Sequence, residues 1–121
     1  MKKLIPILLV FLAACKPEMP EVPKDIIPPD KMIKILEEVH IADAVSETKA
    51  QAGGNEFELT RQYYPLIYKK YGITEEDFRK SYAFYEANPV WMNKMYDTIL
   101  NDLSKKEEEV GKEKRQIRTH E

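Results

Sequence analysis

The chain has 121 residues, with 19 lysines and arginines, 21 aspartates and glutamates, and one cysteine. The formal charge of −2 gives no basic excess, which argues against nucleic acid as a partner because phosphate backbones are bound by clustered Lys and Arg. A single cysteine allows no disulfide within the chain, so the fold depends on its apolar core. The length predicts one small domain.

The first residues form a unit that is separate from this domain. Lys2 and Lys3 precede an uninterrupted apolar run from Leu4 to Ala14. A run of about eleven residues suits the apolar part of a signal peptide, whereas a membrane-spanning helix needs roughly twenty. We therefore predict that residues 1–14 are a signal peptide, which is removed and takes no part in the fold.

The end of the apolar run resembles the lipobox of bacterial lipoproteins. Leu12, Ala13 and Ala14 come directly before the thiol of Cys15. The resemblance implies cleavage between Ala14 and Cys15, a diacylglyceryl group on the Cys15 sulfur, and an N-acyl group on the new amino terminus. Because two or three acyl chains anchor far more firmly than one, we expect this lipid to hold the protein on a membrane. The alternative is that Cys15 is an ordinary buried thiol.

Residues 15–29 follow the predicted cleavage site. Positions 16 to 29 read KPEMPEVPKDIIPP and contain five prolines. Proline-rich segments are extended and semi-rigid, at roughly 3 Å per residue. We therefore predict a tether that lifts the domain by about 40 Å from the bilayer.

Beyond the tether, apolar residues recur at three- and four-residue spacing, which predicts amphipathic helices. Glycines at 53, 54 and 72, a capping Thr74 and the pair Asn88 and Pro89 punctuate this pattern. The expected helices cover residues 31–51, 56–71, 75–87 and 89–103. Pro65 predicts a kink, or a helix that effectively begins there.

Four helices with short connections favour a small antiparallel all-α bundle over residues 30–104. The apolar stripe nearly disappears afterwards, so residues 105–121 are expected to be a charged, frayed and solvated tail. The positions expected to face the core are Met32, Ile35, Leu36, Val39, Ala42, Val45, Phe57, Leu59, Tyr63, Tyr64, Ile67, Tyr68, Tyr71, Phe78, Tyr82, Tyr85, Met92, Met95, Tyr96, Ile99 and Leu103.

Eleven of the twelve aromatic residues lie between positions 57 and 96. They could form a core with tyrosine hydroxyls at its rim, or a docking face, since Tyr and Trp dominate binding hot spots. Two short helices cannot turn every aromatic between positions 82 and 91 toward one core, so we expect one or two to be partly exposed. The candidate partner-binding residues are Phe84, Tyr85 and Trp91.

His40 is the candidate residue for ligand chemistry. Glu37 and Asp43 lie three residues on either side of it and share its helix face. Glu-x-x-His is half of a carboxylate-bridged metal site, but the other histidine, His120, lies in the predicted tail, so we predict no metal and no other cofactor. A ligand pocket between the first and third helices would use His40, Asp43 and Tyr82. The alternative is a half-buried histidine that a local carboxylate stabilises.

No arrangement of residues typical of catalysis is visible. The chain has no Gly-x-Ser-x-Gly turn, and no Lys-Ser or Lys-Thr pair follows Gly53 and Gly54 as a phosphate-binding loop requires. We assign no catalytic residue, and the sequence favours a non-catalytic role while leaving open whether the protein is an enzyme.

Three segments together resemble a known family. They read IIPPDKMIKILEEVHIADA, KKYGITEEDFRKSYAFYEANP and MNKMYDTILNDL. With the lipobox and the tether, they are similar to a family of Bacteroidota lipoproteins, domain-of-unknown-function family 4296, over about residues 22–104. The resemblance implies a helical fold and a cell-envelope lineage, and it implies no activity.

The same lineage suggests where the anchor would lie. In it, lysine followed by acidic residues after the lipidated cysteine can direct export to the cell surface. Here Lys16 is followed by Pro17 and Glu18, which leaves both periplasmic and surface exposure open. We expect the outer membrane.

Three functions are compatible with these observations. The leading hypothesis is a non-catalytic envelope module that docks another envelope protein through exposed aromatic residues such as Phe84 and Trp91. The alternative is a ligand-binding or catalytic pocket that uses His40 and Asp43. A third option is an assembly chaperone, suggested by the tether and the aromatic surface.

Overall fold

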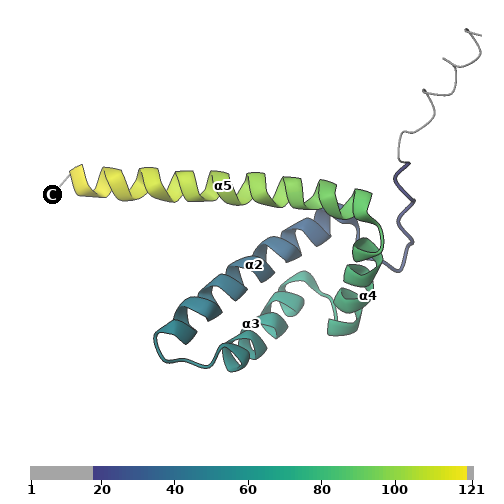
Figure 1. Ribbon diagram of the computed structural model, residues 1–121, viewed down its shortest axis with the longest axis horizontal. Helices are drawn as coiled ribbons and strands as arrows, with labels where there is room; N and C mark the ends of the chain where they lie inside the picture. The colour runs from purple at the N-terminus through teal and green to yellow at the C-terminus, as the bar shows by residue number, and fades with distance from the viewer. Residues whose placement is uncertain (1–17, 120–121) are drawn as a thin grey trace, which may run out of the picture.

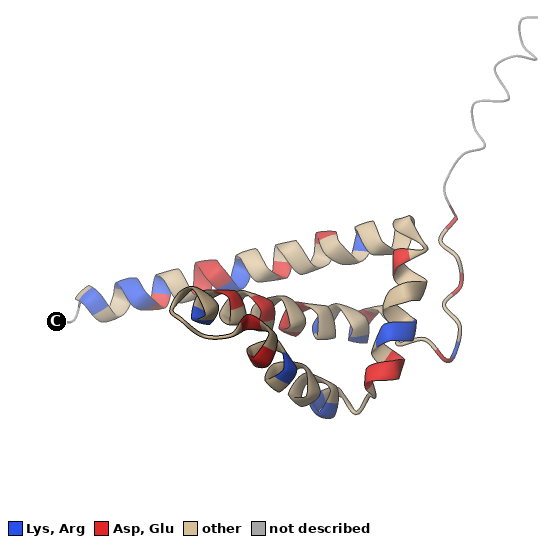
Figure 2. Ribbon diagram, turned by 60° about the horizontal axis from the view of Figure 1, so that its bottom comes forward, with Lys and Arg blue, Asp and Glu red and all other residues tan. Residues whose placement is uncertain are grey.

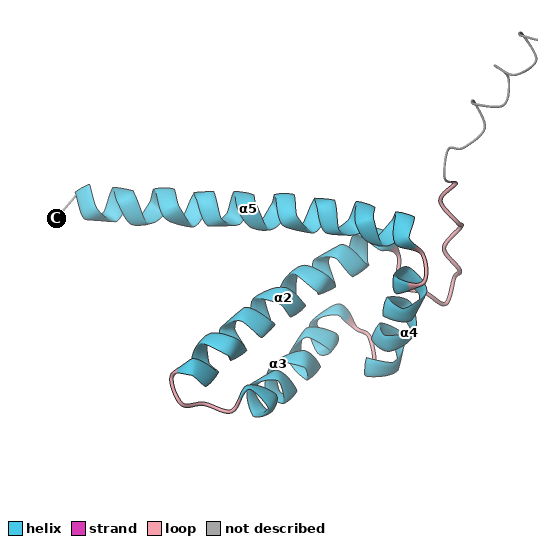
Figure 3. Ribbon diagram, in the orientation of Figure 1, coloured by secondary structure: helices cyan, strands magenta, loops and turns pink. Residues whose placement is uncertain are grey.

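The fold is taken from a computed structural model, which describes residues 18–119. Within this range the chain forms helices and loops and has no strand (Figure 3), which confirms the predicted all-α bundle. The predicted cleavage site at Ala14, the lipidation site at Cys15 and His120 lie outside the described residues. The helices are α2 (Pro29–Gln51), α3 (Glu56–Tyr71), α4 (Glu75–Glu86) and α5 (Pro89–Thr119).

The helix ends follow the local signals in the sequence. Thr74 and Asp77 form a reciprocal capping box at the start of α4, in which the Thr74 hydroxyl accepts from the Asp77 N–H at 3.0 Å and the Asp77 carboxylate accepts from the Thr74 N–H at 2.9 Å. Gly72 ends α3 with a left-handed φ of 63°. The Asn55 side chain caps α3, which runs through Pro65, so a helix start near Pro65 is wrong.

The central helix of the bundle is α2, which packs against both α3 and α5. Figure 1 shows α2 and α3 as an antiparallel hairpin, while α4 crosses its end and α5 then runs in the same general direction as α2. The axes of α2 and α5 diverge toward the C-terminal end of α5 (Figure 1). The short α4 therefore turns the chain so that α5 and α3 lie on different sides of α2.

The core lies where these helices meet. Its buried members are Ile26, Ile27, Met32, Ile35, Leu36, Val39, Ala42, Ile67, Tyr85, Met95 and Ile99. Two positions expected in the core are exposed instead, Val45 and Phe57. On α2 the small Ser46 is fully buried in place of Val45, which leaves the valine side chain on the surface.

The second half of the predicted tether is part of the domain. Ile26 and Ile27 are buried in the core. The Ile27 N–H donates to Ser81 Oγ at 2.9 Å, and the Tyr85 hydroxyl donates to the Ile27 carbonyl at 2.6 Å. Proline favours an extended backbone, but an extended segment can still pack its isoleucines on a helix. The predicted lift of 40 Å is therefore wrong for these residues.

The segment that we expected to be a frayed tail is helical. In the structure α5 continues without interruption to Thr119 and extends past the ends of the other helices (Figure 1). Lys and Glu are good helix formers, and Lys112 pairs with Glu108 at 2.7 Å one turn away. Among the described residues, no helix is long and apolar enough to cross a membrane.

Candidate functional site

Two of the three aromatic candidates, Tyr85 and Trp91, bind the N-terminal segment. Tyr85 is 0 % exposed, so the prediction that it contacts a partner is wrong. Its hydroxyl finds the Ile27 carbonyl, which allows the whole side chain to be buried, and burial raises the pKa of Tyr85 to about 12. Phe84 and Trp91 are half-buried and pack edge-to-face on Tyr85, with ring centroids at 5.2 and 6.2 Å.

Trp91 makes a second contact with the N-terminal segment. Its indole N–H donates to the Pro20 carbonyl at 2.7 Å. Val22, between this contact and the buried isoleucines, is partly buried against the core. Part of the Phe84 and Trp91 surface remains exposed, so docking through these two residues stays a prediction.

The ligand candidates lie among tyrosines, and Tyr96 neighbours both His40 and Tyr82. His40 lies against Tyr96, with ring centroids 5.6 Å apart, and Asp43 accepts a hydrogen bond from the Tyr64 hydroxyl at 2.7 Å. Tyr82 stacks on a phenylalanine of α4, at 6.0 Å between ring centroids. Within the described residues the buried His40 Nε2 has no hydrogen-bond partner. His40 lines a surface groove that neither Asp43 nor Tyr82 lines, so a ligand pocket shared by all three stays a prediction.

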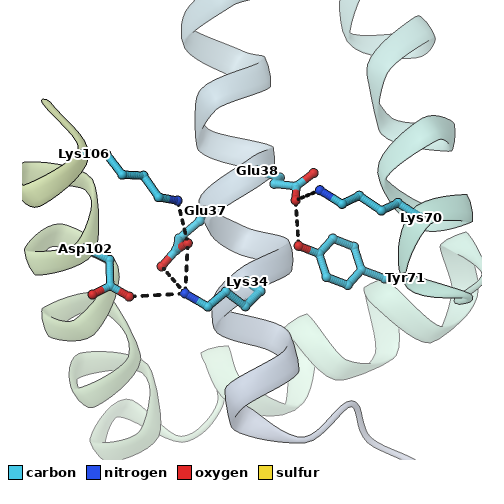
Figure 4. Close-up of polar contacts among 7 residues, drawn as sticks. All are labelled: Lys34, Glu37, Glu38, Lys70, Tyr71, Asp102 and Lys106. Atoms are coloured by element: carbon cyan, nitrogen blue, oxygen red, sulfur yellow. Dashed lines mark hydrogen bonds and ion pairs between the residues drawn. The ribbon is translucent and has the colours of Figure 1, made fainter. Parts of the chain in front are cut away.

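The spacing of Glu37 from His40 suggests half of a metal site, but in the structure Glu37 forms ion pairs with lysines. Its side chain is almost fully buried between α2 and α5, where it accepts from Lys106 Nζ at 3.1 Å and from Lys34 Nζ at 3.4 Å (Figure 4). The negative charge of Glu37 raises the pKa of Lys34, which also contacts Asp102 of α5. In the described part of the chain, no cluster of His, Cys, Asp and Glu could hold a metal ion.

The next residue, Glu38, connects α2 to the opposite neighbour. Its carboxylate accepts from Lys70 Nζ and from the Tyr71 hydroxyl of α3, the latter at 2.6 Å (Figure 4). These two bonds lower the pKa of Glu38, whereas burial and the bond to Glu38 raise the pKa of Tyr71 to about 12. Adjacent side chains on a helix point about 100° apart, so consecutive glutamates can bind α5 and α3.

The Glu38 contacts predict a pH-dependent contribution to stability. Because the folded pKa of Glu38 lies below its ordinary value of 4.5, the contribution is complete above that value and is lost as the pH falls through the folded pKa. Glu38→Gln is expected to lower the free energy of unfolding by about 1 kcal/mol at pH 7. Urea unfolding should show this difference shrinking at pH 3. A difference that is the same at both pH values, or equal to that of the exposed control Glu47→Gln, would contradict this role.

Beside these contacts, α2 and α3 share an exposed apolar surface. We define it as Ile41 and Val45 of α2 with Leu66 of α3, all three of which are exposed. They line a groove of about 300 Å³ between the two helices, which Tyr63 and Lys70 border. Charged residues of both signs are interspersed along the helices around it (Figure 2). Sequence periodicity predicts that Val45 faces the core, so the sequence alone does not indicate this exposed surface.

A second groove lies on the other side of α2. It has a volume of about 480 Å³ and is formed where α2 and α5 diverge. Its apolar walls come from Ile41 and Ala44 on one side and from Leu103 and Val110 on the other. We call it the α2–α5 groove.

These features define a small all-α domain with an N-terminal segment packed into its core and apolar grooves on both sides of its central helix. A family model described as Domain of unknown function (DUF4296) matches residues 23–109. The chain belongs to this family, as the sequence resemblance predicted. The match begins within the packed segment, before the predicted domain start at residue 30. No curated protein and no solved structure matches the chain.

Proposed function

We propose that the protein is a membrane-anchored lipoprotein of the cell envelope, attached to the outer membrane, whose helical domain binds another envelope protein without catalysing a reaction. The anchor is supported by the lysines, the apolar run and the lipobox that end at Cys15. The α2–α3 apolar surface is the observation that carries the binding role. Apolar side chains grouped on a protein surface mark interaction sites, whereas scattered ones need no explanation.

The shape of this surface favours an amphipathic helix as the bound element. Ile41 and Val45 lie one turn apart on α2 and form a ridge next to the groove toward α3. A helix that lays its apolar face into such a groove contacts it through anchor side chains three and four residues apart. Lys70 at the groove edge is already paired with Glu38. By contrast, Lys49, which lies above Tyr63, favours an acidic residue at that border of the incoming helix.

The packed N-terminal segment supports a domain that lies close to the bilayer. Trp91 binds the Pro20 carbonyl, so only five residue steps separate Cys15 from a fixed point on the domain. Fully extended, they span roughly 18 Å. A partner would therefore be met near the membrane surface, where a second membrane-associated protein is available.

Two matched leucine variants test the binding role. Leu66 and Leu100 are 63 % and 61 % exposed, but only Leu66 belongs to the α2–α3 apolar surface. The assay is in-cell crosslinking followed by recovery of the bound envelope protein. Leu66→Glu is expected to reduce this recovery at least about ten-fold, because a charge replaces an apolar anchor in the groove. Leu100→Glu should leave recovery unchanged, and circular dichroism should show both variants folded. Equal recovery with both variants would overturn the assignment of this surface.

A further inference from the structure

The last part of α5 carries an apolar stripe whose outer two members are exposed in the described structure. Leu103, Val110 and Ile117 are spaced seven residues apart, so they lie on one side of the helix. Leu103 is half-buried at the α2–α5 groove, whereas Val110 and Ile117 are 49 % and 60 % exposed. The stripe therefore begins inside the bundle and continues along the projecting helix.

The α2–α5 groove gives this stripe a second wall. Leu103 and Val110 face Ile41 and Ala44 of α2 across the groove. Gly111 also lines it, and a glycine side of a helix allows a neighbouring backbone to approach closely. A helix inserted here would touch apolar groups of both α2 and α5.

Two oppositely charged residues of α5 border the α2–α5 groove. Glu107 and Lys114 both line it, seven residues apart on α5. Neither forms an ion pair with any residue in the described range 18–119. By contrast, Glu108 and Lys112, on a different side of the same helix, pair with each other. The groove thus has one free negative and one free positive charge at equivalent heptad positions.

We propose that a second copy of this chain fills the groove, with the two α5 ends paired antiparallel around Val110. In this register Val110 meets Val110 of the other copy, and Leu103 meets its Ile117 in both directions. Glu107 then lies opposite the second copy's Lys114, and Lys114 lies opposite its Glu107. The two-fold symmetry makes both contacts occur twice, as an isologous dimer interface requires.

The antiparallel arrangement is the one that pairs these two charges. In a parallel pair, position e of one helix faces position g of the other, so Glu107 and Lys114 of the two copies would not meet. In the antiparallel arrangement, each α5 end enters the groove between α2 and α5 of the other copy. Two heptads make a short coiled coil, so the added contact with Ile41 and Ala44 is part of what holds the dimer together.

Cysteine crosslinking of the full chain in the membranes of producing cells tests the pairing. Val110→Cys should form a disulfide-linked homodimer on a non-reducing gel, because the two Val110 side chains meet at the symmetry axis. The exposed control Ala83→Cys on α4, and the parent chain with Cys15 alone, should remain monomeric. A monomeric Val110→Cys chain, or one crosslinked mainly to a different protein, would overturn the proposal.

Charge reversal in the Val110→Cys background separates this dimer from random collision. Lys114→Glu alone is expected to weaken association by about ten-fold, because it places two glutamates together at both ends of the interface. Adding Glu107→Lys should restore the homodimer, since the opposite pairs are recreated with their signs exchanged. The outward-facing control Glu108→Lys should have no effect. Equal crosslinking in all these variants, or no recovery in the double variant, would contradict the antiparallel register.

Discussion

Cys15→Ala is expected to abolish the incorporation of labelled fatty acid into the protein completely. The proposed diacylglyceryl group is attached to the Cys15 sulfur, and Cys15 is the single cysteine of the chain. Each buried methylene of an acyl chain contributes about 0.8 kcal/mol to membrane binding, so losing two or three chains removes the anchor. The variant should also keep its leader and migrate as the larger precursor.

Metabolic labelling followed by gel electrophoresis measures both effects together. Ala14→Gly is the matched control, because it changes the neighbouring residue but keeps it small, and it should still be labelled. Fatty-acid label that persists in Cys15→Ala, or that is absent from the parent protein, would show that the lipobox reading is wrong.

Tyr85→Ala is expected to destabilise the domain by about 3–5 kcal/mol, the usual cost of removing a fully buried aromatic side chain. The cavity would open beside Phe84 and Trp91, whose rings pack on Tyr85. It would also leave the buried Ile27 carbonyl without the hydroxyl that donates to it. Since small domains are stable by only about 5–15 kcal/mol, this loss is a substantial share of the free energy of unfolding.

Tyr85→Phe isolates the hydroxyl from the ring. It should cost about 1–2 kcal/mol, because the Ile27 carbonyl loses its partner while the packing is kept. Tyr63→Phe is the control, since that hydroxyl accepts from an exposed lysine at the surface. Urea unfolding gives the stabilities, and tryptic cleavage after Lys24 reports release of the N-terminal segment. Equal stability and equal cleavage of the two phenylalanine variants would contradict the role given to Tyr85.

The helices could be predicted from the sequence because their ends are specified locally. Thr74 and Asp77 form a capping box within four residues, and Gly72 supplies the left-handed end of α3. Such signals need no knowledge of the tertiary structure. The same holds for the family, because the segments that resemble it are contiguous in the chain and its model matches residues 23–109.

The packing of the N-terminal segment could not be predicted in this way. The backbone of Ile27 forms hydrogen bonds with the side chains of Ser81 and Tyr85, which lie 54 and 58 positions further along the chain. No local periodicity reports such a contact, and the surrounding prolines pointed to a free tether. The sequence predicts exposure of Phe84 and Trp91 because two short helices offer few inward positions. The packed N-terminal segment gives these aromatic side chains additional surface to pack against, which the sequence pattern does not reveal.

The α2–α3 apolar surface could not be predicted because helical periodicity does not distinguish adjacent positions well at the border of a buried face. Val45 and Ser46 are neighbours near the border of the buried face of α2, and hydrophobicity alone assigned the valine to the core. The structure buries the serine and exposes the valine. Glu37 and Glu38 were similarly hidden, because two consecutive glutamates are typical of a solvated helix face, whereas here they bind lysines of α5 and α3.

Photo-crosslinking in living cells from a reactive group at position 45 tests the central claim most directly, because Val45 lies on the α2–α3 apolar surface. We predict one dominant adduct with another envelope protein, which Leu66→Glu abolishes and Leu100→Glu leaves intact. The absence of a protein adduct, or an adduct pattern that Leu66→Glu does not change, would contradict the proposal that this domain works by binding a protein partner there.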